Sequence, residues 1–269
     1  MRTLFSKFID DAAMFPPGNA SAAGAIEAQL RYRDTWWDTM VGPLLIPVTK
    51  WQEFVSAHEA AGSPSLLINV LGTARCPADL PDGVRVAGYE LPVTAPPVPE
   101  PMDGRSIAVE VTADDAGEQV LAAIATARAT SPAVQGKFRT GGTVATAFPD
   151  ESTLAGVIVE AARIGVPMKF TAGLHHSLRH TAQSSGFEHH GFLNVMLATH
   201  RALTGLDDID AVTAALGERD ASVVTDEIKA LSEAQQAAVR GQFTSFGCCG
   251  VGDPIGDLLK LGLISEDYA

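Results

Sequence analysis

The segment Val166-Pro-Met-Lys-Phe-Thr-Ala-Gly-Leu-His-His176 places a lysine in the middle of a short apolar run, followed by a glycine and two adjacent histidines. A lysine in an apolar strand is costly to bury, so such a residue is either paired with an acid or used in chemistry. A strand that ends in reactive groups and continues into a loop is typical of the mouth of a (β/α) barrel. The segment therefore predicts a barrel strand with functional groups at its C-terminal end.

Further apolar runs extend this interpretation to a complete barrel. They are continuous rather than alternating, as expected for parallel strands that are covered on both faces. Together with the opening segment, the predicted strands span residues 7–11, 43–48, 65–71, 84–92, 106–111, 136–142 and 243–248. The count is eight, which is the number a closed barrel of this type requires.

Helical segments separate most of the predicted strands. We predict helices over residues 21–37, 49–61 with Thr49 as N-cap, from Asp114 onward, 150–164 closed by Gly165, 187–203, and 254–261 with Asp253 as N-cap. Residues 207–240 are expected to form an inserted helical pair, within an insertion that spans residues 205–241. The proline-rich connections 72–83 and 94–104 are too irregular for good helices.

These elements predict one domain, residues 1–269, with the fold of an α/β single (β/α)8 TIM-type barrel. Its third and fourth crossovers are irregular, and a helical insertion precedes the eighth strand. An open doubly wound sheet is the alternative. It loses support because the sequence contains neither G-x-G-x-x-G after the first strand nor G-x-x-x-x-G-K-[ST].

Composition restricts the partners. The chain has 269 residues and a formal net charge of −13, which argues against nucleic acid or an anionic membrane surface as a partner, because both are bound by basic patches. No stretch approaches the roughly 20 apolar residues of a membrane-spanning helix. The cysteines, Cys76, Cys248 and Cys249, form no disulfide framework. We therefore expect a cytoplasmic protein that binds a small molecule, and the oligomeric state stays open.

Ionisable and polar residues gather at the predicted C-terminal strand ends, where barrel enzymes place their active sites. Side chains in a strand alternate between faces, so Lys137 shares a face with Arg139, and Lys169 shares one with Thr171. If these faces point inward, cations from strands six and seven confront carboxylates from strands one, four and five. A structural ion-pair network is the alternative interpretation. The candidates are Asp10 or Asp11, Asn69, Glu90, Glu110, Lys137, Arg139, Lys169, Thr171 and, with Cys248, Cys249.

The two lysines lead to the first functional hypothesis. A buried lysine beside another cation has a lowered pKa and can attack a carbonyl to form a Schiff base. A lysine on each of strands six and seven is also the pattern of Schiff-base aldolases with this fold. We expect Lys169 to be the nucleophile or electrostatic stabiliser and Lys137 its tuning neighbour, with Arg139 holding an anionic group of the substrate.

The remaining roles complete this hypothesis. Glu110, Glu90 or Asp10 would be the general base, and His175 or His176 the proton donor. Aldolase, lyase and isomerase chemistry on a small carbonyl- or carboxylate-bearing metabolite all need such a set, and none of them requires a cofactor here.

The histidines lead to a second hypothesis. A metal-dependent hydrolase or lyase could use His175, His176 and His190 with Asp10 or Glu110, in which case a divalent metal is the cofactor. However, no H-E-x-x-H or H-x-H spacing occurs. A third hypothesis is a non-catalytic barrel that binds a small ligand.

Several motifs also resemble a family of uncharacterised barrel-like proteins. The pattern covers residues 10–18, 137–142, 168–177, 190–195, 246–251 and 257–263. Asp11 stands where the family has tyrosine, Ser177 where it has proline, and only Cys249 aligns with the family cysteine. The resemblance implies a barrel with its site at these motifs, so that His190 and Asn194, in H-G-F-L-N-V, become expected substrate contacts. It names no substrate.

Overall fold

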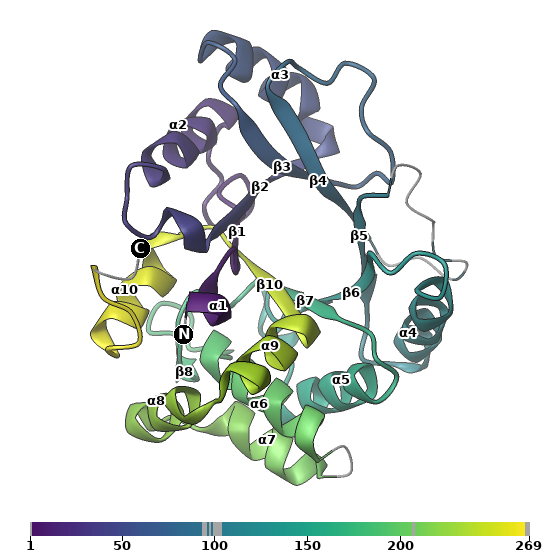
Figure 1. Ribbon diagram of the computed structural model, residues 1–269, viewed down its shortest axis with the longest axis vertical. Coiled ribbons are helices and arrows are strands. Elements are labelled where there is room, and N and C mark those ends of the chain that lie inside the picture. The colour runs from purple at the N-terminus through teal and green to yellow at the C-terminus, as the bar shows by residue number, and fades with distance from the viewer. Residues whose placement is uncertain (1, 93–95, 97, 99–103, 206–207, 267–269) are drawn as a thin grey trace.

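The computed structural model describes residues 2–92, 96, 98, 104–205 and 208–266, and it shows a closed barrel of eight parallel strands (Figure 1). The order around the barrel is β1-β10-β7-β6-β5-β4-β3-β2, so the last strand closes against the first. The predicted TIM-type fold is confirmed. The barrel strands are β1 (Ile9–Asp11), β2 (Val41–Pro47), β3 (Leu66–Leu71), β4 (Val84–Leu91), β5 (Ser106–Val111), β6 (Val134–Arg139), β7 (Met168–Thr171) and β10 (Phe243–Cys248).

Helices lie outside the ring of strands (Figure 1). They are α1 (Arg2–Phe5), α2 (Ala22–Tyr32), α3 (Trp51–Ala60), α4 (Asp115–Ala127), α5 (Glu151–Arg163), α6 (Phe192–Thr204), α7 (Ile209–Gly217), α8 (Ala221–Ala230), α9 (Glu233–Gln242) and α10 (Gly252–Lys260). No helix joins β3 to β4 among the described residues, which confirms the irregular connection predicted there. Most of the predicted connection 94–104 lies outside the described residues.

Local sequence explains several helix ends. Asp114 and Asp150 are N-caps whose carboxylates accept backbone N–H groups of the first turn of α4 and α5. Gly165 follows α5 with a positive φ of 69°, a conformation that glycine adopts without steric cost. Ser232 and Gln235 form a capping box at the start of α9. The signals at Asp114, Asp150 and Gly165 are local, so the helix boundaries near them agree with the predicted ones to within a residue or two.

The helix predicted over residues 21–37 ends at Tyr32, and the strand predicted over residues 136–142 ends at Arg139. Four further predicted boundaries were wrong. Lys7 is not in the first strand, because it takes a positive φ of 46° after α1, and β1 begins only at Ile9. Thr49 does not cap a helix, because it lies inside a 3-10 helix (Val48–Lys50) that runs into α3. Asp253 is the second residue of α10, and Val251 is its N-cap.

The fourth error concerns the segment between β7 and β10. The helix predicted from residue 187 starts at Phe192, because residues 188–189 form the strand β9 (Glu188–His189), which pairs antiparallel with β8 (His180–Thr181). The inserted segment holds three helices, α7, α8 and α9, rather than a pair. The connection between the seventh and eighth barrel strands therefore contains more secondary structure than predicted.

The apolar core lies mainly between the barrel and its helices. Phe8 packs against Phe243 and Phe246, with ring centroids 4.8 Å and 5.0 Å away, and Phe192 of α6 stacks on Phe246 at 5.1 Å. Because strand side chains alternate, this outward packing of Phe246 turns its neighbours Ser245 and Gly247 toward the barrel axis. The inside of the barrel is therefore free to carry polar residues.

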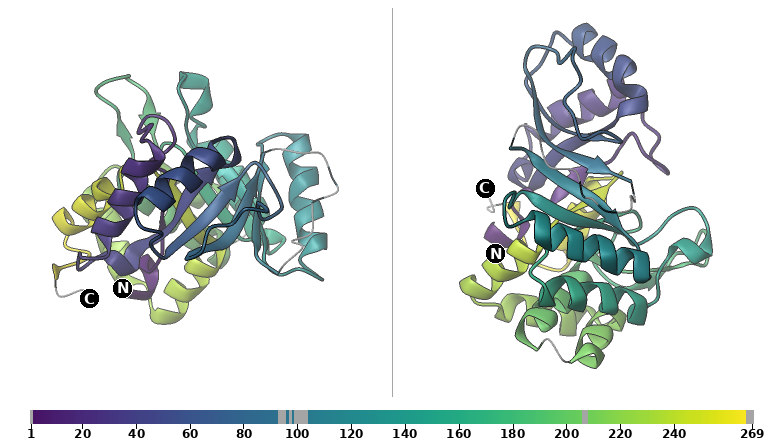
Figure 2. Two further views of the ribbon diagram at one scale, coloured as in Figure 1. Left: turned by 90° about the horizontal axis from the view of Figure 1, so that it is seen from above. Right: turned by 90° about the vertical axis from the view of Figure 1, so that its right-hand side faces the viewer.

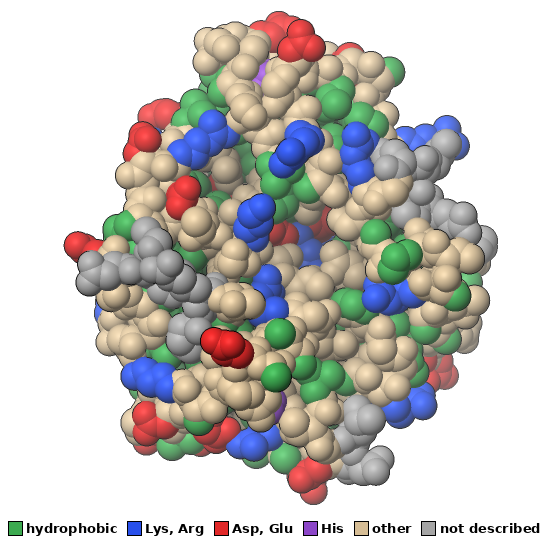
Figure 3. Space-filling model, viewed as in Figure 1, with side chains coloured by type: hydrophobic (Ala, Val, Ile, Leu, Met, Phe, Trp, Pro, Cys, Tyr) green, Lys and Arg blue, Asp and Glu red, His purple; other side chains and the backbone are tan. Residues whose placement is uncertain are grey.

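The loops that follow the strands stand on one side of the molecule. The β6–α5 loop and the β8–β9 hairpin project away from both chain ends (Figure 2). On the face viewed in Figure 3, acidic and basic side chains are interspersed, so the net charge of −13 is not gathered there in one patch. None of the described helices has the length and apolar character needed to cross a membrane.

Candidate active site

A buried ion cluster occupies the inside of the barrel. The ammonium group of Lys169 donates a hydrogen bond to Asp10 Oδ2 at 2.5 Å and a second, short one to Glu90 Oε1. Ser245 Oγ donates to the same oxygen of Asp10 at 2.8 Å. All four residues are buried. Three strands distant in sequence, β1, β4 and β7, thus contribute one charged contact each.

Lys137 belongs to the same cluster but is held less tightly. It is the register partner of both Glu110 on β5 and Lys169 on β7. Its Nζ lies 3.3 Å from Glu110 Oε2 and 3.5 Å from Glu90 Oε2. The side chain of Glu110 is 19% exposed, whereas that of Glu90 is 1% exposed. Glu110 is therefore the carboxylate of this cluster that solvent and a small molecule can reach.

The charges in the cluster set the pKa values of its members. Burial alone would lower the pKa of Lys169, but Asp10 and Glu90 outweigh it and hold that pKa above its usual value. The expectation of a lowered pKa for Lys169 was therefore wrong: the sequence placed carboxylates opposite the lysines but did not reveal that Asp10 and Glu90 both contact Lys169 directly. Burial would raise the pKa of Glu90, but the two lysines outweigh it and hold that pKa below its usual value.

Asp10 behaves differently from Glu90. Burial is the largest influence on its pKa and raises it, even though Lys169 acts in the opposite direction. With every group ionised, three carboxylates and two ammonium groups would leave the cluster with a net charge of −1, from −3 and +2. The carboxylates of the cluster therefore outnumber its ammonium groups by one.

Two buried oxygen atoms in the barrel have no hydrogen-bond donor within the described part of the chain. They are Asn69 Oδ1 on β3 and Glu90 Oε2 on β4. Buried acceptors are nearly always satisfied in folded proteins, and leaving one unsatisfied costs about 1–3 kcal/mol. These atoms are thus available to groups that the chain itself does not supply.

Arg139 and Thr171 lie one step closer to the mouth, on the faces that carry Lys137 and Lys169. Arg139 is exposed and makes no ion pair with any described residue. Thr171 is half-buried, and its Oγ1 lies 3.1 Å from where a Cβ on Gly247 would be. The predicted face-sharing of these pairs is consistent with their register.

A second group of side chains lies where β7 and β10 end. His175 Nδ1 is 3.6 Å from Cys248 Sγ and 3.9 Å from Asp253 Oδ2, and His175 Nε2 is 3.8 Å from Cys249 Sγ. Burial lowers the pKa of His175 and raises the pKa of both thiols. These shifts favour the neutral imidazole and the neutral thiols at pH 7, so the group is not a thiolate–imidazolium ion pair.

His176 has a different partner from its neighbour. Its Nδ1 lies 3.1 Å from Asp257 Oδ2, which also accepts hydrogen bonds from the backbone and hydroxyl of Ser177. Its side chain is 49% exposed. His176 is thus oriented by α10 and faces solvent rather than the lysine cluster.

The structure does not bring His190 and Asn194 to the lysines. His190 Nε2 contacts Pro149 O at 2.9 Å, and burial together with Arg179 lowers the pKa of His190 to about 4. Asn194 accepts from the backbone N–H of Arg179 and donates to Ala215 O and Glu218 O. These contacts connect loops and helices, which is a structural role.

Two further observations limit the metal hypothesis and show what was missed. Among the described residues, no three His, Cys, Asp or Glu side chains are arranged to hold a metal ion. Ser245 was not predicted to belong to the site, although its place two residues before Gly247 on β10 could have indicated a side chain on the same face. Arg179 was also missed, which is buried between Glu151 and Glu188, and for which the sequence offered no signal.

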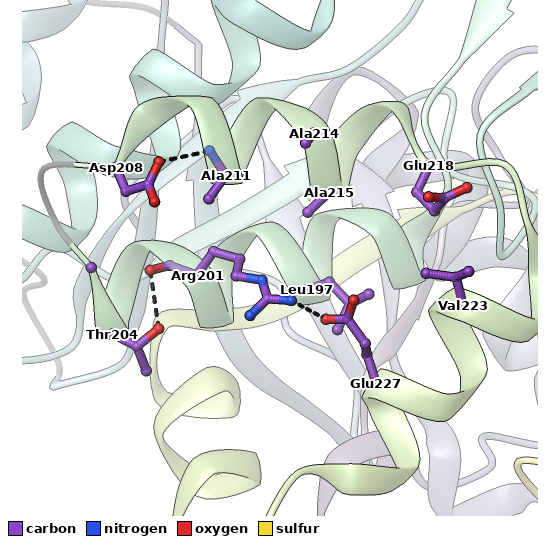
Figure 4. Close-up of a pocket in the computed structure, with 11 residues that line it drawn as sticks. Leu197, Arg201, Thr204, Asp208, Ala211, Ala214, Ala215, Glu218, Val223 and Glu227 are labelled. Carbon is purple, nitrogen blue, oxygen red and sulfur yellow. Dashed lines mark hydrogen bonds and ion pairs between the residues drawn. The ribbon is translucent and has the colours of Figure 1, made fainter.

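A groove of about 390 Å³ lies away from the barrel axis, between α6, α7 and α8. Figure 4 shows that Arg201 and Glu227 pair across it. It contains none of the predicted site residues, and its lining is made of small and exposed side chains. We place the candidate site in the barrel, because the buried ionisable groups converge there. No family model matches the chain, and no curated protein matches its sequence.

Proposed function

We propose that this protein is an enzyme that forms a Schiff base between Lys137 and a small carbonyl compound, with lyase, aldolase or isomerase chemistry. The observation that carries the proposal is the paired placement of two lysines on adjacent strands, one held by two short charged hydrogen bonds and the other by longer ion pairs. The mouth of a (β/α)8 barrel is where such chemistry is placed in this fold.

The contacts favour Lys137 as the nucleophile, which exchanges the roles expected from the sequence. Lys169 would have to break two charged hydrogen bonds before it could attack a carbonyl. Lys137 has only the longer contacts, and Glu110 Oε2 at 3.3 Å can take the proton that its ammonium group must lose.

The reaction then follows the usual course of amine catalysis. The Lys137 amine adds to the carbonyl carbon, the C=O electron pair moves to oxygen, which takes a proton, and loss of water leaves a protonated imine. In a cleavage, Glu110 removes a hydroxyl proton, the adjacent C–C bond breaks, and its electron pair enters the imine to give an enamine. Protonation of the enamine carbon and hydrolysis by one water release the second product. In an isomerisation the base removes a C–H proton instead.

The rest of the site supplies recognition and charge. Arg139 at the mouth binds an anionic substituent of the substrate through paired N–H groups. Lys169 stabilises negative charge that develops beside the imine, and Asp10 and Ser245 keep it in position. We place this enzyme in a reducing compartment such as the cytoplasm, which agrees with its three free cysteines, and we expect no nucleic-acid or membrane partner.

Borohydride trapping tests the proposal. The protein is incubated with pyruvate or with dihydroxyacetone, reduced with sodium borohydride, and mapped by peptide mass spectrometry. We expect one adduct, on Lys137, that is lost in Lys137→Met and retained in Lys229→Met, a change at an exposed helical lysine. An adduct on Lys169 instead would restore the roles expected from the sequence. No adduct on either lysine with either ketone would refute the Schiff-base proposal.

A further inference from the structure

The two unsatisfied oxygen atoms of the barrel lie on neighbouring strands. Asn69 pairs in register with Gly88 on β4, and Glu90 follows Gly88 by two residues on the same strand. Residues two apart in a strand share a face, so Gly88 and Glu90 both point to the side of the sheet on which the ion cluster lies. Asn69 Oδ1 and Glu90 Oε2 are therefore diagonal neighbours on the inner wall.

Both side chains are fixed in ways that leave these atoms free. Glu90 commits Oε1 to Lys169 and keeps its charge, because the two lysines lower its pKa. Its Oε2 is ion-paired with Lys137 Nζ at 3.5 Å and has no closer donor among the described residues. The amide of Asn69 makes no side-chain hydrogen bond to any described residue. One wall of the barrel thus presents two acceptors with room for a closer donor, and the Glu90 oxygen lies beside the proposed nucleophile.

A carboxylate and an amide oxygen select for hydrogen-bond donors. Glu90 Oε2 would repel an anionic group, and an ether oxygen would offer it no donor. An alkyl group would leave both acceptors buried without a hydrogen-bond donor. A hydroxyl group provides one O–H donor and fits beside a carbonyl carbon without a change of charge. Sites built to bind a hydroxyl group reject the analogue that lacks it strongly, because their own polar atoms are then unsatisfied.

We propose that Asn69 and Glu90 form a hydroxyl-binding subsite, so that the substrate is a small hydroxylated ketone or aldehyde whose hydroxyl-bearing carbons adjoin the carbonyl that reacts with Lys137. This inference rests on the proposed function for the position of the carbonyl group. The hydroxyl group donates a hydrogen bond to Glu90 Oε2 and keeps its proton, so no bond is broken. Arg139, on the opposite flank of Lys137 toward the mouth, takes the anionic end of such a molecule where one is present.

Three ketones with the same carbon skeleton provide the test. Acetone, hydroxyacetone and dihydroxyacetone carry zero, one and two hydroxyl groups, and the concentration that gives half-maximal borohydride labelling of Lys137 is measured for each. The three ketones differ in intrinsic electrophilicity. To remove this difference, the labelling of Lys137 by each ketone is divided by the labelling of Nα-acetyllysine under the same conditions. We expect the normalised affinity to rise about tenfold per hydroxyl group, the size of one net hydrogen bond.

Asn69→Leu replaces the amide by a side chain of similar volume, and we expect it to lose about one tenfold step of the affinity gained from the hydroxyl groups. Asn69→Ser is expected to retain part of that step. The control is Gln52→Leu, which makes the same kind of change on the exposed surface of α3 and should behave as wild type. Circular dichroism melting confirms that each variant is folded. Equal normalised affinities for the three ketones, or discrimination unchanged in Asn69→Leu, would overturn the hydroxyl subsite.

A measurement without a carbonyl group separates this inference from the proposed function. Glycerol and 1-propanol are compared by saturation-transfer NMR on wild type and Asn69→Leu. Glycerol binding that disappears in Asn69→Leu, together with a lack of ketone adducts, would support the subsite and refute the Schiff base. Ketone adducts on Lys137 with no hydroxyl preference and no glycerol binding would support the Schiff base and refute the subsite.

Discussion

Lys137 and Lys169 are register partners on adjacent strands, yet only Lys169 is clamped, with Asp10 on one side and Glu90 on the other. Lys137 shares only Glu90 with it, at the longer distance of 3.5 Å, and reaches the partly exposed Glu110 at 3.3 Å. Two lysines at equivalent positions can therefore have different roles, one fixed as a charge and one able to react. This asymmetry, rather than the presence of two lysines, is what the proposed chemistry depends on.

The clamp makes a prediction about stability. Replacing Lys169 by methionine leaves Asp10 buried without its ammonium partner and Glu90 with only the longer contact to Lys137. Breaking such a buried pair costs about 3–5 kcal/mol of unfolding free energy. Urea unfolding monitored by fluorescence measures this. Arg163→Met is the control, because its pair with Glu160 is solvent-exposed and should matter little. Similar losses in the two variants would mean that Lys169 is not held as the geometry implies.

Acid stability should depend on His190. Its pKa falls from 6.5 to about 4 on folding because it is buried, so the unfolded chain binds a proton more readily than the folded one. The stabilisation is complete above pH 6.5 and is lost as the pH falls from 6.5 to about 4, by about 3 kcal/mol in all. His190→Gln should flatten this part of the pH profile of urea midpoints. If the urea midpoint of His190→Gln falls with decreasing pH as steeply as that of wild type, His190 is not the group responsible for the loss of stability.

The sequence predicted the barrel well because its signals are local. The apolar runs of β2 and β5 and the caps Asp114 and Asp150 need only neighbouring residues to be recognised. The role of a polar residue, in contrast, depends on partners that are distant in the sequence. The amide of Asn194, an expected substrate contact, donates to Ala215 O and Glu218 O. Carboxylates facing Lys169 were predicted, but not that Asp10 and Glu90 contact it closely enough to outweigh the effect of burial on its pKa.

The cysteines should differ in reactivity. Cys248 is fully buried and Cys249 half-buried, and burial raises the pKa of both thiols, so little thiolate is present at pH 8. Iodoacetamide labelling followed by peptide mass spectrometry should show Cys248 protected until the protein is unfolded in urea, and Cys249 labelled slowly and faster as the pH is raised. Rapid labelling of Cys248 in the folded protein would show that the segment around His175 opens.

Arg139 should determine the preference for anionic substrates without affecting the amine chemistry. It is exposed, has no ion pair among the described residues, and stands two residues after Lys137 on the same strand face. A charged hydrogen-bonded contact is worth about 1.5–3 kcal/mol, so Arg139→Ala should raise the pyruvate concentration for half-maximal labelling of Lys137 by about 10- to 100-fold. Acetone, which lacks a carboxylate, should be unaffected.

Arg139→Lys should restore only part of the affinity, because an ammonium group cannot form the paired N–H contacts of a guanidinium. Added salt should weaken pyruvate labelling of wild type and leave Arg139→Ala unchanged. Equal losses for pyruvate and acetone would instead mean that Arg139 positions Lys137 rather than the substrate.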